Sequence, residues 1–137
     1  MASIRENKQE LAQIYAKAAN QLASELETGW TNFVIGYFVC ENESDHFLVF
    51  VTNDEGKTWC DFMDVVFNSD EIKEGVFSCR ESMQELHAVC AAKGDKWSCC
   101  TMIVNKYGEF SVEFDYKPML EMNTVYRDIW KAKYAIV

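Results

Sequence analysis

The chain has 137 residues, 49% of them hydrophobic, with one proline, six glycines and a formal net charge of −9. Such a composition excludes a disordered chain, and the length predicts a single domain over residues 1–137. The negative charge argues against binding to nucleic acid or to an anionic membrane, because their phosphates would be repelled.

The first predicted element is an amphipathic helix. Ser3 and Glu6 have the spacing of a capping box. Apolar residues then recur with the helical period from Leu11 to Leu26. Gly29 is placed to end this helix.

A three-stranded antiparallel meander is predicted next. Trp30–Cys40 is apolar on both faces, as expected of a strand near the centre of a sheet. His46–Thr52 and Lys57–Met63 read as the second and third strands, each preceded by a polar turn.

The second half of the chain predicts a helix, two strands and a short closing helix. Ser78 repeats the capping-box spacing with Glu81, and Gly94 is the stop signal. The two strands and the last helix, capped by Asn123 or Thr124, are predicted in the ranges Trp97–Asn105, Gly108–Tyr116 and Asn123–Tyr134. The fold class is therefore α+β, with a mostly antiparallel sheet and the helices on one side.

No catalytic or metal-binding motif stands out. The six cysteines lie in apolar patterns without a Cys-x-x-Cys pair, and they read as small buried hydrophobic residues. His46 and His87 lie far apart in the sequence, and no motif joins either one to a nucleophile. We expect no enzyme activity, no cofactor and no metal.

The location of the protein is also predicted from what the sequence lacks. The first ten residues have no apolar run typical of a signal peptide, and no run approaches the roughly 20 residues of a membrane span. We therefore expect a cytoplasmic protein that does not bind membranes.

The charge excess is concentrated in the middle of the chain. Twelve acidic and three basic residues lie between Glu41 and Glu85. The candidate binding residues are the carboxylates of one stretch that also carries large apolar side chains: Asp61, Asp64, Asp70, Glu71 and Glu74. If one or two of the apolar side chains stay at the surface, they form an anchor ringed by carboxylates that suits a basic protein partner. A solvated loop is the other interpretation, and the sequence leaves both open.

A second acidic surface is possible on the strand Gly108–Tyr116. Its residues alternate regularly, so that Glu109, Glu113 and Asp115 share one face. That face must be exposed to solvent, and it is the alternative binding surface.

Spaced aromatic residues in the last third of the chain carry a resemblance to a known family. A turn glycine and a lysine belong to the same pattern, which comprises Trp97, Gly108, Phe110, Phe114, Tyr116, Trp130, Lys133 and Tyr134. This pattern resembles the YezG-like immunity proteins of bacterial polymorphic-toxin and contact-dependent growth inhibition systems. The resemblance implies a small cytoplasmic protein that binds a cognate secreted toxin, often a nuclease, and neutralises it. An acidic surface would suit a basic toxin domain.

The alternative function is that of a type III secretion chaperone. Those chaperones are also small and acidic, with a similar order of helices and strands, and they hold an extended effector segment as homodimers. A chaperone would leave the activity of its partner largely intact, whereas an immunity protein would abolish it. The sequence does not decide whether this chain associates with itself.

Overall fold

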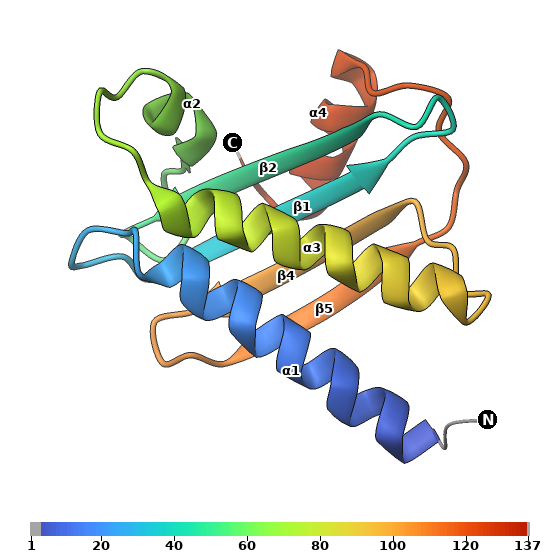
Figure 1. Ribbon diagram of the computed structural model, residues 1–137. Helices are drawn as coiled ribbons and strands as arrows, with labels where there is room; N and C mark the ends of the chain where they lie inside the picture. Colours follow the sequence, from blue (N-terminus) through green and yellow to red (C-terminus); the bar gives the residue numbers. More distant parts are fainter. Residues whose placement is uncertain (1–3, 137) are drawn as a thin grey trace. The chain divides into compact units, whose positions relative to one another are not determined.

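The computed structural model describes residues 4–136, which contain four α-helices and five β-strands (Figure 1). These elements form two compact units. A helical unit comprises the chain up to Leu26 together with Lys73–Lys96, and a sheet unit comprises Glu27–Ile72 and the chain from Trp97 onward. The predicted α+β class is confirmed. Ser3 of the predicted capping box lies outside the described residues.

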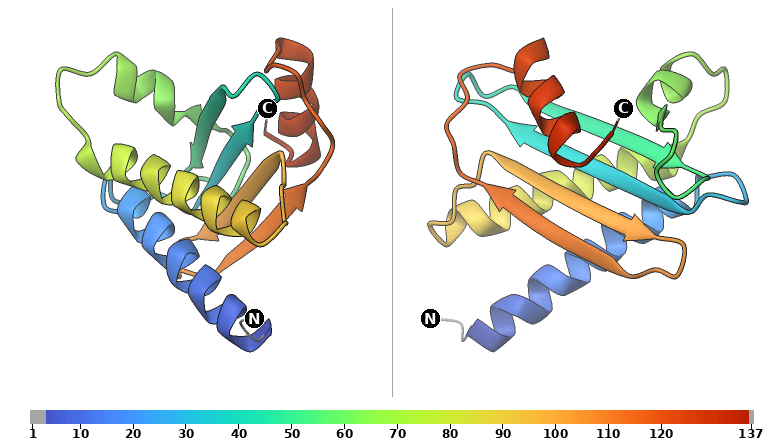
Figure 2. Two further views of the ribbon diagram at one scale, coloured as in Figure 1. Left: turned by 45° about the vertical axis from the view of Figure 1, so that its right-hand side comes forward. Right: turned by 180° about the vertical axis from the view of Figure 1, so that it is seen from behind.

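The helical unit is a pair of helices, α1 (Ile4–Ala23) and α3 (Glu74–Ala92), which lie side by side (Figures 1 and 2). Gly75 permits a close approach, because a β-carbon there would collide with the carbonyl oxygen of Gln21. The Ser82 hydroxyl donates to Gln21 Oε1 at 2.6 Å. Two ion pairs join the exposed sides of these helices: Lys17–Glu85 at 2.7 Å and Lys93–Glu10 at 2.8 Å.

Two predicted helix boundaries in this region were wrong: the C-terminus of the first helix and the N-terminus of the second. The first helix ends at Ala23, and Gly29 lies beyond it in a turn, with φ +104°. α3 begins at Glu74, so Ser78 is inside the helix, where its carbonyl accepts from the Ser82 hydroxyl. The stop at Gly94 is confirmed, since α3 ends at Ala92 and Gly94 has φ +84°.

The sheet unit contains the five strands in the order β3-β2-β1-β4-β5, with every neighbouring pair antiparallel. Their bounds are β1 Asn32–Val39, β2 Asp45–Thr52, β3 Cys60–Asp61, β4 Cys99–Asn105 and β5 Phe110–Asp115. The prediction for the first strand is confirmed, because β1 is central and buried from Phe33 to Phe38. The predicted antiparallel sheet is therefore correct.

The predicted third strand is the main error. Within Lys57–Met63, only Cys60–Asp61 pairs with β2, and a short helix follows at once, α2 (Phe62–Phe67). Asp61 ends the strand because its side chain accepts a hydrogen bond from the Asp64 N–H at 3.2 Å and thereby caps α2. The edge strand is thus two residues long.

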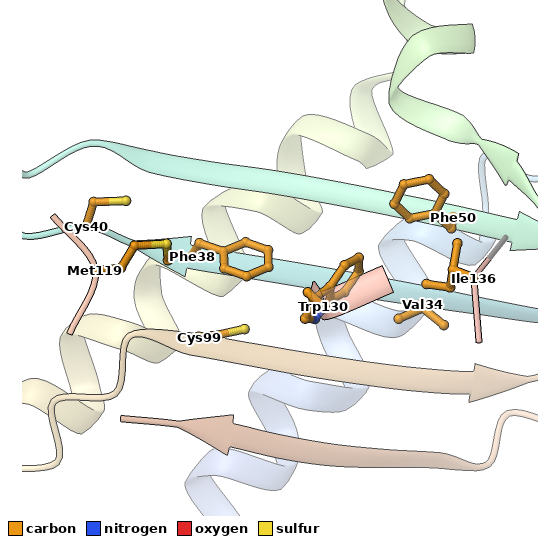
Figure 3. Close-up of a cluster of buried hydrophobic side chains, with 8 residues drawn as sticks. All are labelled: Val34, Phe38, Cys40, Phe50, Cys99, Met119, Trp130 and Ile136. Carbon is orange, nitrogen blue, oxygen red and sulfur yellow. The ribbon is translucent and has the colours of Figure 1, made fainter. Parts of the chain in front are cut away.

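The closing helix, α4 (Thr124–Lys133), packs on one face of the sheet through Trp130. Its predicted cap is confirmed, as the Asn123 side chain accepts from the Tyr126 N–H at 2.9 Å. Figure 3 shows the cluster around Trp130, which comprises Val34, Phe38, Cys40, Phe50, Cys99, Met119, Trp130 and Ile136. Gly36 lies beneath the indole, since a β-carbon there would be 2.5 Å from Trp130 Cζ2. That all helices gather on one side of the sheet stays a prediction.

The cysteines behave largely as expected. All six fall within the described residues as thiols, and five of them are buried. Cys60 is the exception, because it lies exposed on the short edge strand β3.

Candidate functional site

The first candidate surface is the stretch from Asp61 to Ile72, called here the acidic segment, which lies within the sheet unit. Its helix α2 contacts β2 and buries Phe62 and Val66. Phe67, the next residue, points away from this contact and is 74% exposed. Ile72 is 78% exposed. Val65 is 42% exposed, so the segment carries three apolar side chains at the surface, of which Phe67 and Ile72 are the most exposed.

Three of the predicted carboxylates flank these apolar side chains in sequence. Asp64, Asp70 and Glu71 are all exposed. The loop that carries the last two is ordered by local hydrogen bonds: Asn68 Nδ2 donates to the Asp64 carbonyl at 2.8 Å, and the Glu71 N–H donates to Ser69 Oγ at 3.1 Å. The arrangement is an apolar anchor with a carboxylate margin.

Asp61 and Glu74, the other two candidate carboxylates, are placed differently from these three. Asp61 Oδ2 accepts from Arg127 Nη2 at 2.8 Å while Asp61 caps α2, so its carboxylate is engaged within the chain. Glu74 is exposed but lies in the first turn of α3, in the helical unit. A carboxylate near a helix N-terminus favours the helix itself. Of the five candidates, Asp64, Asp70 and Glu71 are thus exposed within the acidic segment.

The alternative surface on β5 lies on the face of the sheet that α4 covers. A line of paired residues crosses the sheet and places their side chains on one face: Asp61, Phe50, Val34, Ile103 and Ser111. Glu113, two residues after Ser111, shares that face. Glu109, Glu113 and Asp115 are exposed, as predicted.

Each of these three carboxylates has a hydrogen-bond partner nearby. Glu113 accepts from the Tyr134 hydroxyl of the chain after α4, Glu109 accepts from Asn105 Nδ2, and Asp115 accepts from the Lys117 N–H. Burial, together with the hydrogen bond to Glu113, raises the pKa of Tyr134 well above its usual value. Tyr134 therefore stays protonated at neutral pH and donates to Glu113.

A pocket of about 140 Å³ lies between α4 and this edge of the sheet. Its apolar lining includes Phe38, Met119 and Trp130. Its charged lining groups are Glu113, Asp115, Lys117 and Lys133, so that two carboxylates are offset by two ammonium groups. The pocket does not favour a basic partner, and in this it differs from the acidic segment.

The sequence did not reveal Phe67, Ile72 or Arg127 as members of the site. A signal for Phe67 exists once α2 is recognised, because Phe62 and Val66 have the i, i+4 spacing of a buried face and Phe67 falls outside it. Arg127 lies 66 residues from Asp61, and no local pattern announces their contact.

Other classes of site find no support in the described part of the chain. It contains no group of three or more His, Cys, Asp or Glu side chains placed to hold a metal ion. None of its helices combines the length and apolar character needed to cross a membrane.

Several residues of the recognised pattern are structural. Trp97 is buried and lies 5.4 Å from the Phe114 ring, and Gly108 adopts φ +81° in the turn between β4 and β5. Trp130 Nε1 donates to Thr101 Oγ1 at 2.9 Å, and Tyr134 bonds to Glu113. These residues hold the strands and α4 together.

Comparison with known proteins identifies the family. A search of curated proteins finds no match to this chain. The family model described as "Immunity protein YezG-like" matches residues 11–135, which include every element of the sheet unit and most of the helical unit. The chain therefore belongs to the YezG-like family of immunity proteins.

Proposed function

We propose that this protein binds a cognate toxin domain through the acidic segment and neutralises it by covering a basic surface of the toxin. The observation that carries the proposal is the exposure of Phe67 and Ile72 beside Asp64, Asp70 and Glu71. Membership in an immunity-protein family favours such a binding role without catalysis.

The two kinds of side chain in the segment have separate tasks. Large apolar side chains that enter a pocket supply most of the binding energy of an interface. Carboxylates around them steer a cationic partner and pair with its Arg and Lys groups. The complementary toxin surface is an apolar depression surrounded by basic residues.

A nuclease is the toxin class that fits best. Enzymes that grip phosphate have cationic clefts, which attract a carboxylate-rich surface. The concentration of acidic residues between Glu41 and Glu85 supports this match. The segment would then stand in for nucleic acid, either in the cleft or beside it.

The test reverses three exposed charges of the acidic segment together: Asp64→Lys, Asp70→Lys and Glu71→Lys. The partner to be tested is a toxin domain encoded immediately upstream, where the genome carries one, with its activity followed in a nuclease assay. Association at low salt should slow by about 10- to 100-fold and lose most of its salt dependence. Unchanged association and protection would contradict the proposal.

The matched variant reverses Glu109, Glu113 and Asp115 on the other acidic surface. If the acidic segment is the contact, this variant should keep the salt dependence of association. Because it also removes the bond from Tyr134 to Glu113, Tyr134→Phe serves as the control for that loss. A larger effect of this triple change would move the interface to β5.

A further inference from the structure

Asp61 joins three parts of the sheet unit. It pairs with Phe50 at the sheet edge, its Oδ1 accepts from the Asp64 N–H, and its Oδ2 accepts from Arg127 Nη2. Both carboxylate oxygens are therefore used. One of them fixes the first turn of α2, and the other is held by α4.

α2 needs this support because it is six residues long. Isolated helices shorter than about 12 residues are marginal in water. Its orientation depends on the burial of Phe62 and Val66 at one side and on its cap at the N-terminus. Phe67 stands at the last helical position, so a change at the cap changes where Phe67 points.

We propose that Arg127 is a positioning residue for toxin binding, which holds Asp61 and thereby fixes the direction in which α2 presents Phe67 and Asp64. The expected effect on toxin binding rests on the proposed function. The link from Arg127 through Asp61 to α2 does not depend on it. Arg127 makes no contact with the partner in this scheme. It acts through Asp61, and α4 thereby controls the acidic segment.

The neighbour Lys131 provides a matched control on the same helix. The Arg127 guanidinium lies 5.9 Å from the centre of the Phe50 ring, and Lys131 Nζ lies 5.1 Å from it. The two side chains therefore bring equal charge to the same ring. In the described residues Arg127 forms an ion pair with Asp61, whereas Lys131 forms none with it.

The first measurement is amide hydrogen exchange of the free, full-length chain. Arg127→Ala should speed exchange at residues 64–67 by about fivefold, comparable to the weakening of a helix cap. Lys131→Ala should leave these amides unchanged. In an Asp61→Ala background, Arg127→Ala should add nothing, because its partner is already absent. Unchanged exchange in Arg127→Ala would overturn the inference.

The second measurement is binding to the upstream-encoded toxin domain. Arg127→Ala should weaken binding about fivefold, whereas Lys131→Ala should not. Faster exchange in α2 without weaker binding would retain the link between α4 and α2 and would overturn the acidic segment as the toxin contact. An equal loss of affinity in Arg127→Ala and Lys131→Ala would instead show that only the positive charge matters for binding, and would overturn the positioning role of Arg127.

Discussion

α2 and α4 are built from similar parts and put them to different uses. Each is a short helix of the sheet unit with an Asp or Asn cap, and each has a large aromatic residue near its end: Phe67 in α2 and Trp130 in α4. Trp130 is buried and its indole N–H is bonded to Thr101, whereas Phe67 is 74% exposed. A buried, satisfied aromatic stabilises a fold, while an exposed one among carboxylates is available to a partner.

The recognised family pattern includes residues of α4 and none of α2. Trp130 and Tyr134 lie in α4 and directly after it, and none of the residues that carry the pattern lies in the acidic segment. The family pattern therefore carries no information about the acidic segment. The two helices should respond differently to substitution.

The largest expected effect is the loss of Trp130. Trp130→Ala should lower the free energy of unfolding by about 3–5 kcal/mol, because it leaves a cavity in the cluster beneath α4 and removes the indole N–H that donates to the Thr101 hydroxyl. Trp97→Ala should cost a similar amount, since Trp97 is also buried. Urea denaturation measures both, with Phe67→Ala as a control that should stay within about 0.5 kcal/mol of the wild type. A loss at Phe67 as large as that at Trp130 would remove the distinction between the two helices.

The next effect concerns binding rather than stability. Phe67→Ala should weaken toxin binding by about 2 kcal/mol, or roughly 30-fold in Kd, because it removes the anchor while the fold keeps its stability. Titration calorimetry with the upstream-encoded toxin domain gives the Kd. Val125→Ala is the control, since Val125 is an exposed aliphatic residue on α4 outside the acidic segment. Equal weakening by both variants would refute the anchor.

Much of the sheet could be predicted because strand signals are local. The alternating residues of β5, the doubly apolar β1 and the Asn123 cap of α4 are each contained in a few neighbouring residues. α2 could not be predicted in the same way. Its sequence, FMDVVF, has the Val and Phe content of a strand, and the competing signal was a single Asp at its cap.

The candidate site could be predicted only in part for a similar reason. The carboxylates stand out by local charge, and Asp64, Asp70 and Glu71 prove to be exposed. Whether Phe67 or Val66 enters the core depends on the helix that the sequence concealed. The engagement of Asp61 depends on Arg127, which approaches from α4 across the fold. Contacts between distant residues set the roles that composition leaves open.

A smaller loss is expected where α4 crosses the sheet. Gly36→Ala places a β-carbon against the Trp130 ring, and such overpacking costs about 1–3 kcal/mol. The variant should be destabilised in urea denaturation, because the Trp130 ring and the added methyl group compete for the same space. A stable Gly36→Ala protein would mean that α4 shifts easily on the sheet.

The smallest effect belongs to Tyr134, which fastens the chain after α4 to β5. Tyr134→Phe should cost about 0.5–1 kcal/mol at neutral pH, since it removes one hydrogen bond to an exposed carboxylate.

The raised pKa of Tyr134 also makes the stability of the wild type depend on alkaline pH. The folded chain keeps a proton that the unfolded chain releases above about pH 10, so this contribution is complete below that pH and declines as the pH rises. The stability gap between the wild type and Tyr134→Phe should therefore narrow from pH 8 to 11 in urea denaturation. The other tyrosines titrate in both proteins, so they leave the gap unaffected. A stability difference that stays constant over this pH range would mean that the hydroxyl does not hold α4 to the sheet. If the difference narrows while amide hydrogen exchange in α2 is the same in both proteins, the bond serves the fold alone.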